Sequence, residues 1–189
     1  MGFKNILLIS VLAASLSGCD RQETRSALVL EGKTMGTVWR VSLAGVDPGR
    51  KADLQHAIQQ QLDQDDQTLS TWKKDSVLSR FNQYQGSDPQ PVSADMADIV
   101  VEALRIGKKT EGAMDITVGP LVNLWGFGPA KPPAHTPTDA EIAGAKAQTG
   151  LQHLHVIQSV EGQWLQKDLP ALYVDLSTMG EGYATDHLA

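Results

Sequence analysis

The sequence predicts an α+β fold in which packed helices cover mixed sheets. Short stretches that alternate apolar and polar residues indicate strands, while other stretches carry apolar residues at the spacing of an amphipathic helix. These elements do not follow one another as regular strand–helix–strand units, which disfavours an α/β fold with a parallel sheet. With 189 residues, the chain has room for one ordinary domain or for a large piece of a bigger one.

The folded part is expected to begin with two strands, Ala27 to Glu31 and Thr37 to Leu43, on either side of the glycine-containing connection Gly32 to Gly36. A surface helix is expected next, over Arg50 to Asp63, because apolar residues recur there at helical spacing. These residues are Leu54, Ala57, Ile58 and Leu62. This part of the chain therefore mixes a strand pair with a helix.

Two further helices are marked by their caps. Ser93 can cap a helix that runs to about Glu111, with a glycine just past its end. Thr138 and Glu141 have the spacing of a capping box, which predicts a short helix that stops at Gly150.

Three more strands are expected toward the end of the chain, over Leu151 to Ile157, Gln163 to Gln166 and Ala171 to Leu176. The chain then enters a helix that has no stop signal before Ala189. We therefore expect the sequence to be the N-terminal part of a single domain whose C-terminal part lies outside it.

The first residues have the pattern of a bacterial lipoprotein signal. Lys4 supplies a positive charge, residues 6–16 are apolar, and the run Leu16 to Cys19 resembles the box at which cleavage leaves a lipid-modified cysteine. Residues 1–18 are therefore predicted to be a signal peptide, residues 19–26 a polar tether and residues 27–189 the folded domain. A plain secretory signal with an unrelated cysteine is the alternative.

A lipid on Cys19 would anchor the protein to a membrane, since two or more acyl chains hold a protein stably on a bilayer. Asp20 follows this cysteine and resembles the signal that retains lipoproteins on the inner membrane, although it also suits a polar tether. The predicted location is the periplasmic side of the cell inner membrane.

The composition excludes several other functions. The net charge is -6 and the Lys and Arg residues are not clustered, which argues against binding to nucleic acid. Cys19 is the only cysteine. The folded part therefore has no disulfide, thiolate zinc site, cysteine nucleophile or iron–sulfur cluster.

The run Glu111 to Pro129 combines apolar residues with four glycines. Glycines permit turns and close backbone approach that a side chain would block, which favours a wall of a ligand site. The alternative is a helix end followed by a strand and a loop.

Asp175 lies where the last expected strand ends, and Thr178 lies where the next helix begins. The N–H groups at a helix N-terminus attract anions, and Gly180 and Gly182 would let a phosphate or a ribose come close. Thr178 and Glu181 also have the spacing of a capping box, which alone would explain both residues.

Trp72, His153 and His155 each allow a functional and a structural interpretation. The indole of Trp72 could stack on a flat heterocycle, although most tryptophans simply bury one face in a core. The two histidines alternate along an expected strand, so they share one face like a metal-binding pair. No third ligand lies near them in the sequence, which favours the structural interpretation.

Four segments taken together resemble the ApbE family of FAD:protein FMN transferases. The segments are Gly32 to Thr37, Leu69 to Asn82, Ala113 to Gly128 and Val174 to Tyr183, and in order and spacing they cover nearly all of the chain after the tether. The lipoprotein box agrees with the envelope forms of the family. The resemblance implies an ApbE-like, T-fold-related architecture.

By the same resemblance, the expected activity is transfer of the FMN half of FAD to a threonine or serine of a target protein, with release of AMP and dependence on Mg²⁺. The expected targets are flavin-accepting subunits of membrane redox complexes. The positions that correspond to FAD contacts in the family are Met35, Trp72, Ala113, Met114, Asp115, Asp175 and Glu181, and Thr178 corresponds to a metal-binding position. Many family members carry Lys where Glu181 stands, and residues 120–129 are expected to shape the pocket.

The family's remaining metal ligands lie in the part that we expect this sequence to lack. We therefore expect the 189 residues alone to be inactive. A second hypothesis is a non-catalytic envelope lipoprotein that binds a flavin or another nucleotide, and a third is an anchored interaction module without a small ligand. The sequence does not identify the general base.

Overall fold

The computed structural model describes residues 27–189, so the predicted signal peptide, the predicted lipidation site Cys19 and the predicted tether lie outside the described residues. The elements are, in chain order, β1 (Leu28–Thr34), β2 (Thr37–Leu43), the 3₁₀ turn η1 (Pro48–Arg50), α2 (Lys51–Leu69), α3 (Val77–Gln83), β3 (Gln90–Val92), α4 (Ala94–Lys109), α5 (Gly119–Leu124), α6 (Asp139–Lys146), the 3₁₀ turn η2 (Leu151–His153), β4 (Leu154–Ser159), β5 (Gly162–Lys167) and α7 (Ser177–Leu188). Helices and antiparallel sheets of this kind confirm the predicted α+β class.

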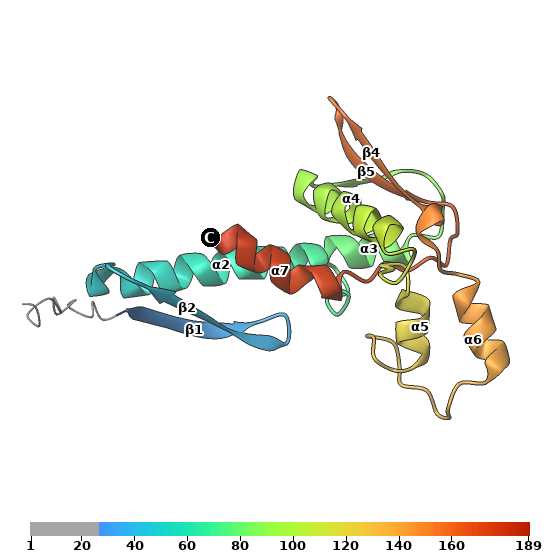
Figure 1. Cartoon of the computed structure of the whole chain (residues 1–189), viewed down its shortest axis with the longest axis horizontal. Helices are drawn as coiled ribbons and strands as arrows, with labels where there is room; N and C mark the ends of the chain where they lie inside the picture. Colours follow the sequence, from blue (N-terminus) through green and yellow to red (C-terminus); the bar gives the residue numbers. More distant parts are fainter. Residues whose placement is uncertain (1–26) are drawn as a thin grey trace, which may run out of the picture.

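Figure 1 shows an elongated arm, formed by β1, β2 and α2, that extends from a broader part containing α3 to α6 and the β4–β5 pair. Helix α7 lies along α2 where the arm meets the broader part. The site described below lies at this junction.

The arm is built on a tight hairpin. β1 and β2 pair antiparallel from Leu28↔Leu43 to Thr34↔Thr37, which confirms both predicted strands, although β1 runs three residues beyond its predicted end at Glu31. The two residues between the strands, Met35 and Gly36, have φ angles of 49° and 75°. A two-residue loop with positive φ at both positions matches the right-handed twist of the flanking strands.

Helix α2 holds the outer edge of β1 through glutamine side chains. Gln55 Nε2 donates to the Glu31 carbonyl at 2.8 Å, and Gln59 Nε2 donates to the Lys33 carbonyl at 3.0 Å. These bonds satisfy carbonyl groups that an edge strand would otherwise leave unpaired. The helix runs six residues beyond its predicted end at Asp63, and Leu69 in its last turn belongs to the core.

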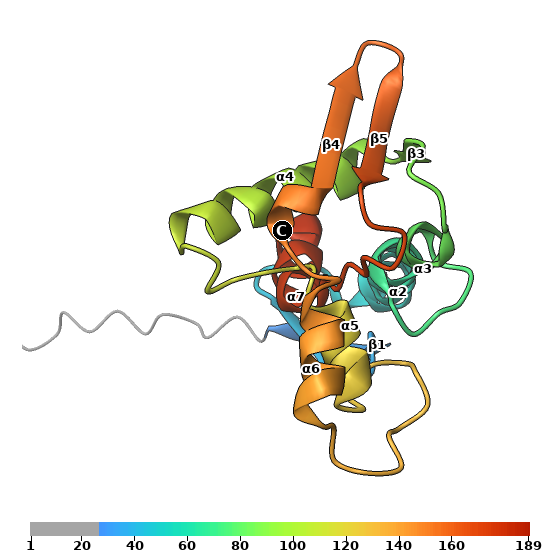
Figure 2. The ribbon, with the colours of Figure 1, turned by 90° about the vertical axis from the view of Figure 1, so that its right-hand side faces the viewer.

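The second sheet has three antiparallel strands in the order β3-β5-β4, and Figure 2 shows the β4–β5 hairpin projecting above α4. The strands predicted around residues 151–157 and 163–166 are confirmed, although residues 151–153 form η2 instead of strand. The strand predicted over Ala171 to Leu176 is wrong. Its one ladder-type pairing is an isolated parallel bridge between Tyr173 and Val118.

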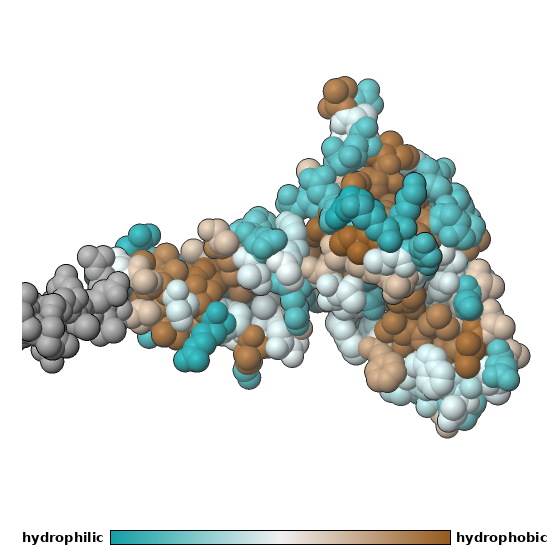
Figure 3. All heavy atoms as spheres, in the orientation of Figure 1, coloured by the Kyte–Doolittle hydropathy of each residue, from teal (hydrophilic) through white to brown (hydrophobic). Residues whose placement is uncertain are grey.

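The hydrophobic core lies in the broader part, between α3, α4, β4, β5 and the segment before α7. Its buried members are Leu69, Leu78, Phe81, Met96, Ile99, Val100, Ala103, Ile116, Leu154, Leu165, Leu172, Val174 and Leu176. Figure 3 shows further apolar surface along the arm and around α5, where Phe127 is 78% exposed. Within residues 27–189, no helix is both long and apolar enough to cross a bilayer.

Two predicted helix caps are confirmed. The Ser93 hydroxyl accepts from the Met96 N–H at the start of α4. Thr138 and Glu141 bond each other's backbone N–H groups, which completes the capping box of α6. Helix α6 ends at Lys146, before the predicted stop at Gly150.

Candidate functional site

A hollow of about 440 Å³ lies at the junction of the arm and the broader part. Three structures surround it: the tip of the β1–β2 hairpin, the loop between α2 and α3, and the first turn of α7. Its lining residues are Met35, Gly36, Asp66, Leu69, Ser70, Thr71, Trp72, Lys73, Leu176, Ser177, Gly180 and Glu181. Of the predicted FAD contacts, the structure brings Met35, Trp72 and Glu181 together here.

Trp72 lies in a short loop that serine side chains hold in shape. The Ser70 hydroxyl accepts from the N–H groups of Trp72 at 3.1 Å and Lys73 at 3.2 Å. The Ser70 carbonyl in turn accepts from the hydroxyls of Ser76 at 2.5 Å and Ser79 at 3.1 Å. The loop is thus fixed by α3, whose N-cap is Ser76.

The indole of Trp72 is 65% exposed, which excludes the interpretation that it is a core residue. A large apolar ring on a fixed loop at the rim of a hollow is suited to stack on a flat ligand. Lys73 beside it forms an ion pair with Asp66 at 2.7 Å, so a cation and an anion also lie in the wall of the hollow.

Asp175 and Thr178 lie where α7 begins, next to the hollow lining. Asp175 Oδ1 accepts from the Ser177 N–H at 2.9 Å and from the Ser177 hydroxyl at 2.5 Å. Thr178 and Glu181 are both exposed on the first turns of α7. The capping-box interpretation of these two residues is wrong, because the N-cap is Leu176 and Thr178 already lies inside the helix.

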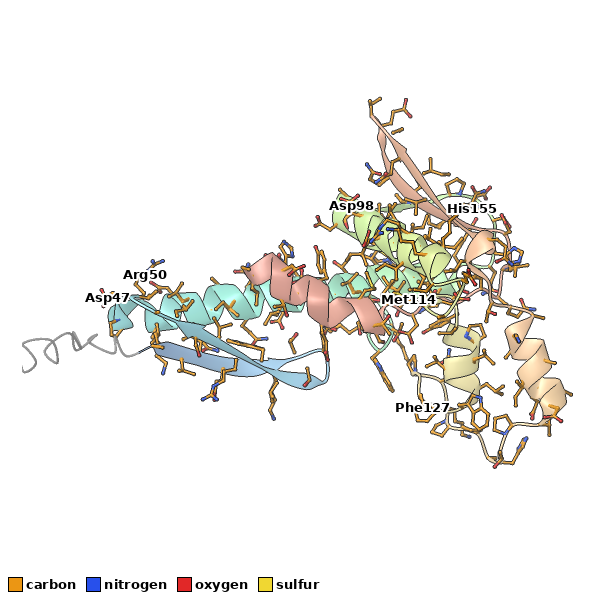
Figure 4. The ribbon with its side chains drawn as sticks, viewed as in Figure 1. Asp47, Arg50, Asp98, Met114, Phe127 and His155 are labelled. Carbon is orange, nitrogen blue, oxygen red and sulfur yellow. The ribbon has the colours of Figure 1, made fainter. Side chains whose placement is uncertain are left out.

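The run Glu111 to Pro129 contains a short helix, α5, where the structural alternative expected a strand. Gly119 begins this helix in close contact with Tyr173, because a Cβ at this glycine would lie 2.6 Å from the Tyr173 carbonyl oxygen. The glycine therefore serves close packing of two chain segments. Figure 4 shows that Met114 lies near the inner end of α7, whereas Phe127 lies beyond α5.

Ala113, Met114 and Asp115 are not part of the hollow lining. Asp115 faces a separate depression of about 520 Å³ near Gly107 and Leu151. The run is nevertheless joined to the site, because the Asp175 N–H donates to the Ile116 carbonyl at 2.7 Å. The structure thus places the predicted contacts in two neighbouring groups.

The two groups share one local motif. Asp115 Oδ1 accepts from the N–H of Thr117 at 2.7 Å and from its hydroxyl at 2.6 Å, as Asp175 does from Ser177. In both segments the carboxylate bonds the residue two positions later, which fixes a turn. Each turn directs the chain into the helix that follows it.

Sequence reasoning missed the polar residues that hold the segment before the Asp175 turn in place. Asn82, in α3, bonds both backbone polar groups of Val174 at 2.8 Å. Lys167, at the end of β5, is 1% exposed and donates to the carbonyls of Asn82 and Leu172, each at 3.1 Å. These contacts join residues 82 and 174 across the chain, so no local sequence pattern marks them.

Burial and nearby carboxylates shift several pKa values around the site. Burial lowers the pKa of Lys167 to about 8, since the protonated amine is withdrawn from water. Burial, and then the charge of Asp175, raise the pKa of Tyr173. Burial, followed by the charges of Asp95 and Asp65, raises the pKa of Tyr183 to about 12.

The residues described do not make a metal site by themselves. Among residues 27–189 there is no group of three His, Cys, Asp or Glu side chains placed to hold a metal ion. Thr178 offers one hydroxyl, and Asp175 already accepts two hydrogen bonds through Oδ1. Mg²⁺ usually binds one or two carboxylates together with phosphates and water, so this set does not fit a complete Mg²⁺ site.

His153 and His155 both face the carboxylate of Asp168. His155 Nε2 lies 2.8 Å from Asp168 Oδ2, and His153 Nδ1 lies 3.7 Å from the same oxygen. The hydrogen bond from His155 is the main cause of the lowered pKa of Asp168. The two histidines thus share an exposed carboxylate, in agreement with their structural interpretation.

The chain is similar to known proteins in family, sequence and structure. The family model of ApbE matches residues 35–189. The FAD:protein FMN transferase of Salmonella typhimurium is 65% identical over 179 residues, which cover 92% of this chain and 51% of the relative. The FAD:protein FMN transferase of Escherichia coli strain K12 is 60% identical over 189 residues, which cover 96% of this chain and 54% of the relative.

Solved structures with the same family name also align with this chain. The flavin transferase ApbE from Vibrio cholerae aligns with a TM-score of 0.79 and 45% identity, over 86% of this chain and 52% of that one. The apo form of the Pseudomonas stutzeri flavinyl transferase ApbE aligns with a TM-score of 0.75 and 34% identity, over 86% and 53%. The chain spans about half the length of the curated relatives it matches. On these grounds the chain belongs to the ApbE family.

Proposed function

We propose that this chain forms about half of an FAD:protein FMN transferase and that FAD is its substrate. The observation that carries the proposal is the hollow that the exposed Trp72 and the first turn of α7 line together. Its volume falls within the range of about 300–1,000 Å³ that is usual for small-molecule sites. The names of the family relatives support the assignment of FAD as the ligand.

The two sides of the hollow suit the two kinds of group in FAD. Trp72 offers an aromatic face on which a flat ring can stack. The first turn of α7 offers the positive end of a twelve-residue helix, which attracts phosphate oxygens. The N–H groups of Ser177, Met179 and Gly180 are already bonded within the protein, so the helix dipole, not these N–H groups, supplies the attraction. FAD contains both flat rings and a diphosphate, so one molecule can use both sides.

The proposed reaction splits the diphosphate of FAD. The hydroxyl oxygen of a threonine or serine on the target protein attacks the phosphorus on the FMN side, and the bond from that phosphorus to the oxygen of AMP breaks. AMP leaves with the bonding electron pair, and the hydroxyl proton passes to a general base. In such reactions catalysis is mainly positioning of the reactants and stabilisation of charge on the phosphates.

Dependence on Mg²⁺ is a further part of the proposal. When bound, Mg²⁺ would neutralise charge on the phosphate oxygens, and Thr178 is the described residue proposed to contribute to its site. Its exposed position at the start of α7 leaves the hydroxyl accessible. Thr178→Val keeps the shape of the side chain and removes this oxygen, so it is expected to raise the Mg²⁺ concentration needed for half-maximal activity.

The proposed location and partners rest on the sequence. The lipoprotein box supports an anchor on Cys19, and Asp20 supports retention on the inner membrane, with the folded domain on the periplasmic side. The proposed partners are flavin-accepting subunits of membrane redox complexes. Incorporation of labelled palmitate into the wild-type chain, and its loss in Cys19→Ala, would test the anchor.

The activity is tested in a chimera in which this chain replaces the matched region of the Salmonella typhimurium relative. The chimera is incubated with FAD, Mg²⁺ and a flavin-accepting protein, and AMP is followed by chromatography while the acceptor is weighed by mass spectrometry. We expect AMP and a covalent FMN adduct in equal amounts. FAD binding without AMP would favour the non-catalytic flavin-binding lipoprotein, and no change in flavin fluorescence would favour the interaction module.

The 189-residue chain is tested in parallel with the same acceptor. We expect no adduct, because the described residues lack a complete Mg²⁺ site. The relative from Salmonella typhimurium serves as the positive control for acceptor and reagents. A covalent FMN adduct formed by the chain alone would refute the expectation that it is inactive.

A further inference from the structure

We infer that Asn82 and Lys167 are positioning residues for the flavin site, because together they fix the backbone of residues 172–174 and hence the place of Asp175 and the first turn of α7. This inference rests on the proposed function, since it concerns the site in which FAD is proposed to bind. The two residues are called the buried brace below.

The amide of Asn82 takes the place of a neighbouring strand. Its Oδ1 accepts from the Val174 N–H at 2.8 Å, and its Nδ2 donates to the Val174 carbonyl at 2.8 Å. Val174 is completely buried and belongs to no strand, so water cannot satisfy these backbone groups. A buried N–H or carbonyl without a partner costs free energy of folding. The Asn82 side chain provides a partner for both the N–H and the carbonyl of Val174.

Lys167 supports the contact between Asn82 and Val174 by bonding backbone groups on both sides of it. Its ammonium group donates to the Asn82 and Leu172 carbonyls, each at 3.1 Å, and lies 5.4 Å from the centre of the Phe81 ring. Asn82 is in the last turn of α3, where carbonyls have no partner within the helix and attract cations. No carboxylate forms an ion pair with Lys167 among the described residues.

Packing alone does not account for this lysine. Withdrawal of an amine from water is unfavourable, and burial accordingly lowers its pKa to about 8. An apolar residue would fill the same space without that cost, but it would leave the two carbonyls unpaired. The contacts of Lys167 therefore point to the geometry of residues 172–174 as its role.

Helix α3 connects the buried brace to the opposite side of the hollow. Its N-terminal residues Ser76 and Ser79 bond the Ser70 carbonyl and hold the loop of Trp72. Its C-terminal residue Asn82 holds Val174, one residue before Asp175. A helix of seven residues thus sets the distance between the aromatic side and the α7 side of the hollow.

The test compares Asn82→Ala, the isosteric Asn82→Asp and Lys167→Met with Val100→Ala, all in the chimera. Val100 is a buried core residue in α4 that neither hydrogen-bonds to the brace nor pairs with it in a sheet, so its truncation controls for lost stability. FAD affinity and the kcat for AMP release are measured at a temperature where every variant is folded. We expect at least a tenfold weaker FAD affinity and a lower kcat in the brace variants, and less than a twofold change in Val100→Ala.

Hydrogen exchange of the 189-residue chain tests the geometry without FAD. We expect Asn82→Ala to speed exchange of the Val174 amide at least tenfold while the amides of the β1–β2 hairpin keep their protection. Equal loss of affinity in Asn82→Ala and Val100→Ala, or normal FAD binding in a variant with an unprotected Val174 amide, would overturn the inference. A wild-type chimera that binds no FAD would instead refute the proposed function, and the exchange of the Val174 amide would still uphold or overturn the brace.

Discussion

The backbone N–H of Asp175 donates to the carbonyl of Ile116 at 2.7 Å. Next to this bond, Tyr173 and Val118 form an isolated parallel bridge. The two contacts join the segment that carries Ala113 to Asp115 to the segment that begins α7. A ligand held at the first turn of α7 is therefore coupled to both groups of predicted FAD contacts, although only one group lines the hollow.

Asp175→Ala is expected to weaken FAD binding and AMP release by the chimera about tenfold or more. The change removes two hydrogen bonds to a carboxylate at the start of α7, and bonds to charged groups contribute about 1.5–3 kcal/mol each. Asp75→Ala is the matched control. Asp75 is exposed and its contacts with Gln67 and Arg80 use the backbone carbonyl, which alanine keeps. Equal activity of the two variants would count against the site.

Trp72→Ala is expected to weaken FAD binding by about three- to tenfold, in line with about 0.5–1.5 kcal/mol for an aromatic contact. Trp72→Phe should recover part of that affinity. The thermal midpoint should hardly change, because the indole is largely exposed. Trp125→Ala provides the control, since Trp125 is also exposed but lies outside the hollow lining. Fluorescence titration with FAD measures all three, and a matching loss in Trp125→Ala would argue against stacking on Trp72.

Lys167 is expected to make the stability of the wild-type chain rise with pH above neutrality. Its pKa is about 8 in the folded state, whereas an ordinary solvated lysine has a pKa of 10.5, so the unfolded chain binds more protons between these values. The free energy of unfolding therefore increases from about pH 8 to about pH 10.5, by on the order of 1–3 kcal/mol. Tyr183 acts in the opposite direction above pH 10, because its pKa is raised to about 12.

Urea unfolding of the wild-type chain and Lys167→Met, at pH 7.5, 9 and 10, isolates the contribution of the lysine. The free energy of unfolding of the wild-type chain, relative to that of Lys167→Met, should increase as the pH rises. A difference that stays constant over this range would mean that the buried amine does not titrate in the folded state as expected.

Gly119→Ala is expected to destabilise the chain by about 1–3 kcal/mol, the usual cost of forcing an extra methyl group into a packed region. The new Cβ would press on the Tyr173 ring and lie 2.6 Å from its carbonyl oxygen. Gly144→Ala in α6 meets no neighbouring atom within 4 Å and should stabilise by about 0.5–1 kcal/mol. Thermal unfolding followed by circular dichroism measures both changes, and similar midpoints would contradict the proposed contact.

Signals that act over a few residues were sufficient to predict much of the fold. The strands of the first hairpin, the Ser93 cap and the Thr138–Glu141 capping box all depend on neighbours within a few residues, and each is confirmed. The predicted strand over Ala171 to Leu176 failed because its partner is a side chain. Asn82 provides the hydrogen bonds that a neighbouring strand would give, and it lies 92 residues away from Val174.

For the candidate site, three residues singled out through the family resemblance, Met35, Trp72 and Glu181, come together from separate segments. Their contact with FAD stays a prediction. Ser70, Lys73 and Asp66 complete the lining without having been singled out. Lys167 gave no signal at all, because a lysine in a polar strand resembles a surface residue. Its role depends on burial by segments that are distant along the chain, and a single sequence does not show which segments pack together.

The bonds between Ser70 and the hydroxyls of Ser76 and Ser79 also bear on the entropy of ligand binding. Fixing the backbone of one flexible residue costs about 1–2 kcal/mol at room temperature, and a loop that becomes ordered only when its ligand arrives loses that much affinity for each residue. Here the backbone from Ser70 to Lys73 is already ordered by hydrogen bonds within the protein. The conformational entropy of this loop is therefore lost during folding, and stacking of a ring on Trp72 does not have to offset it.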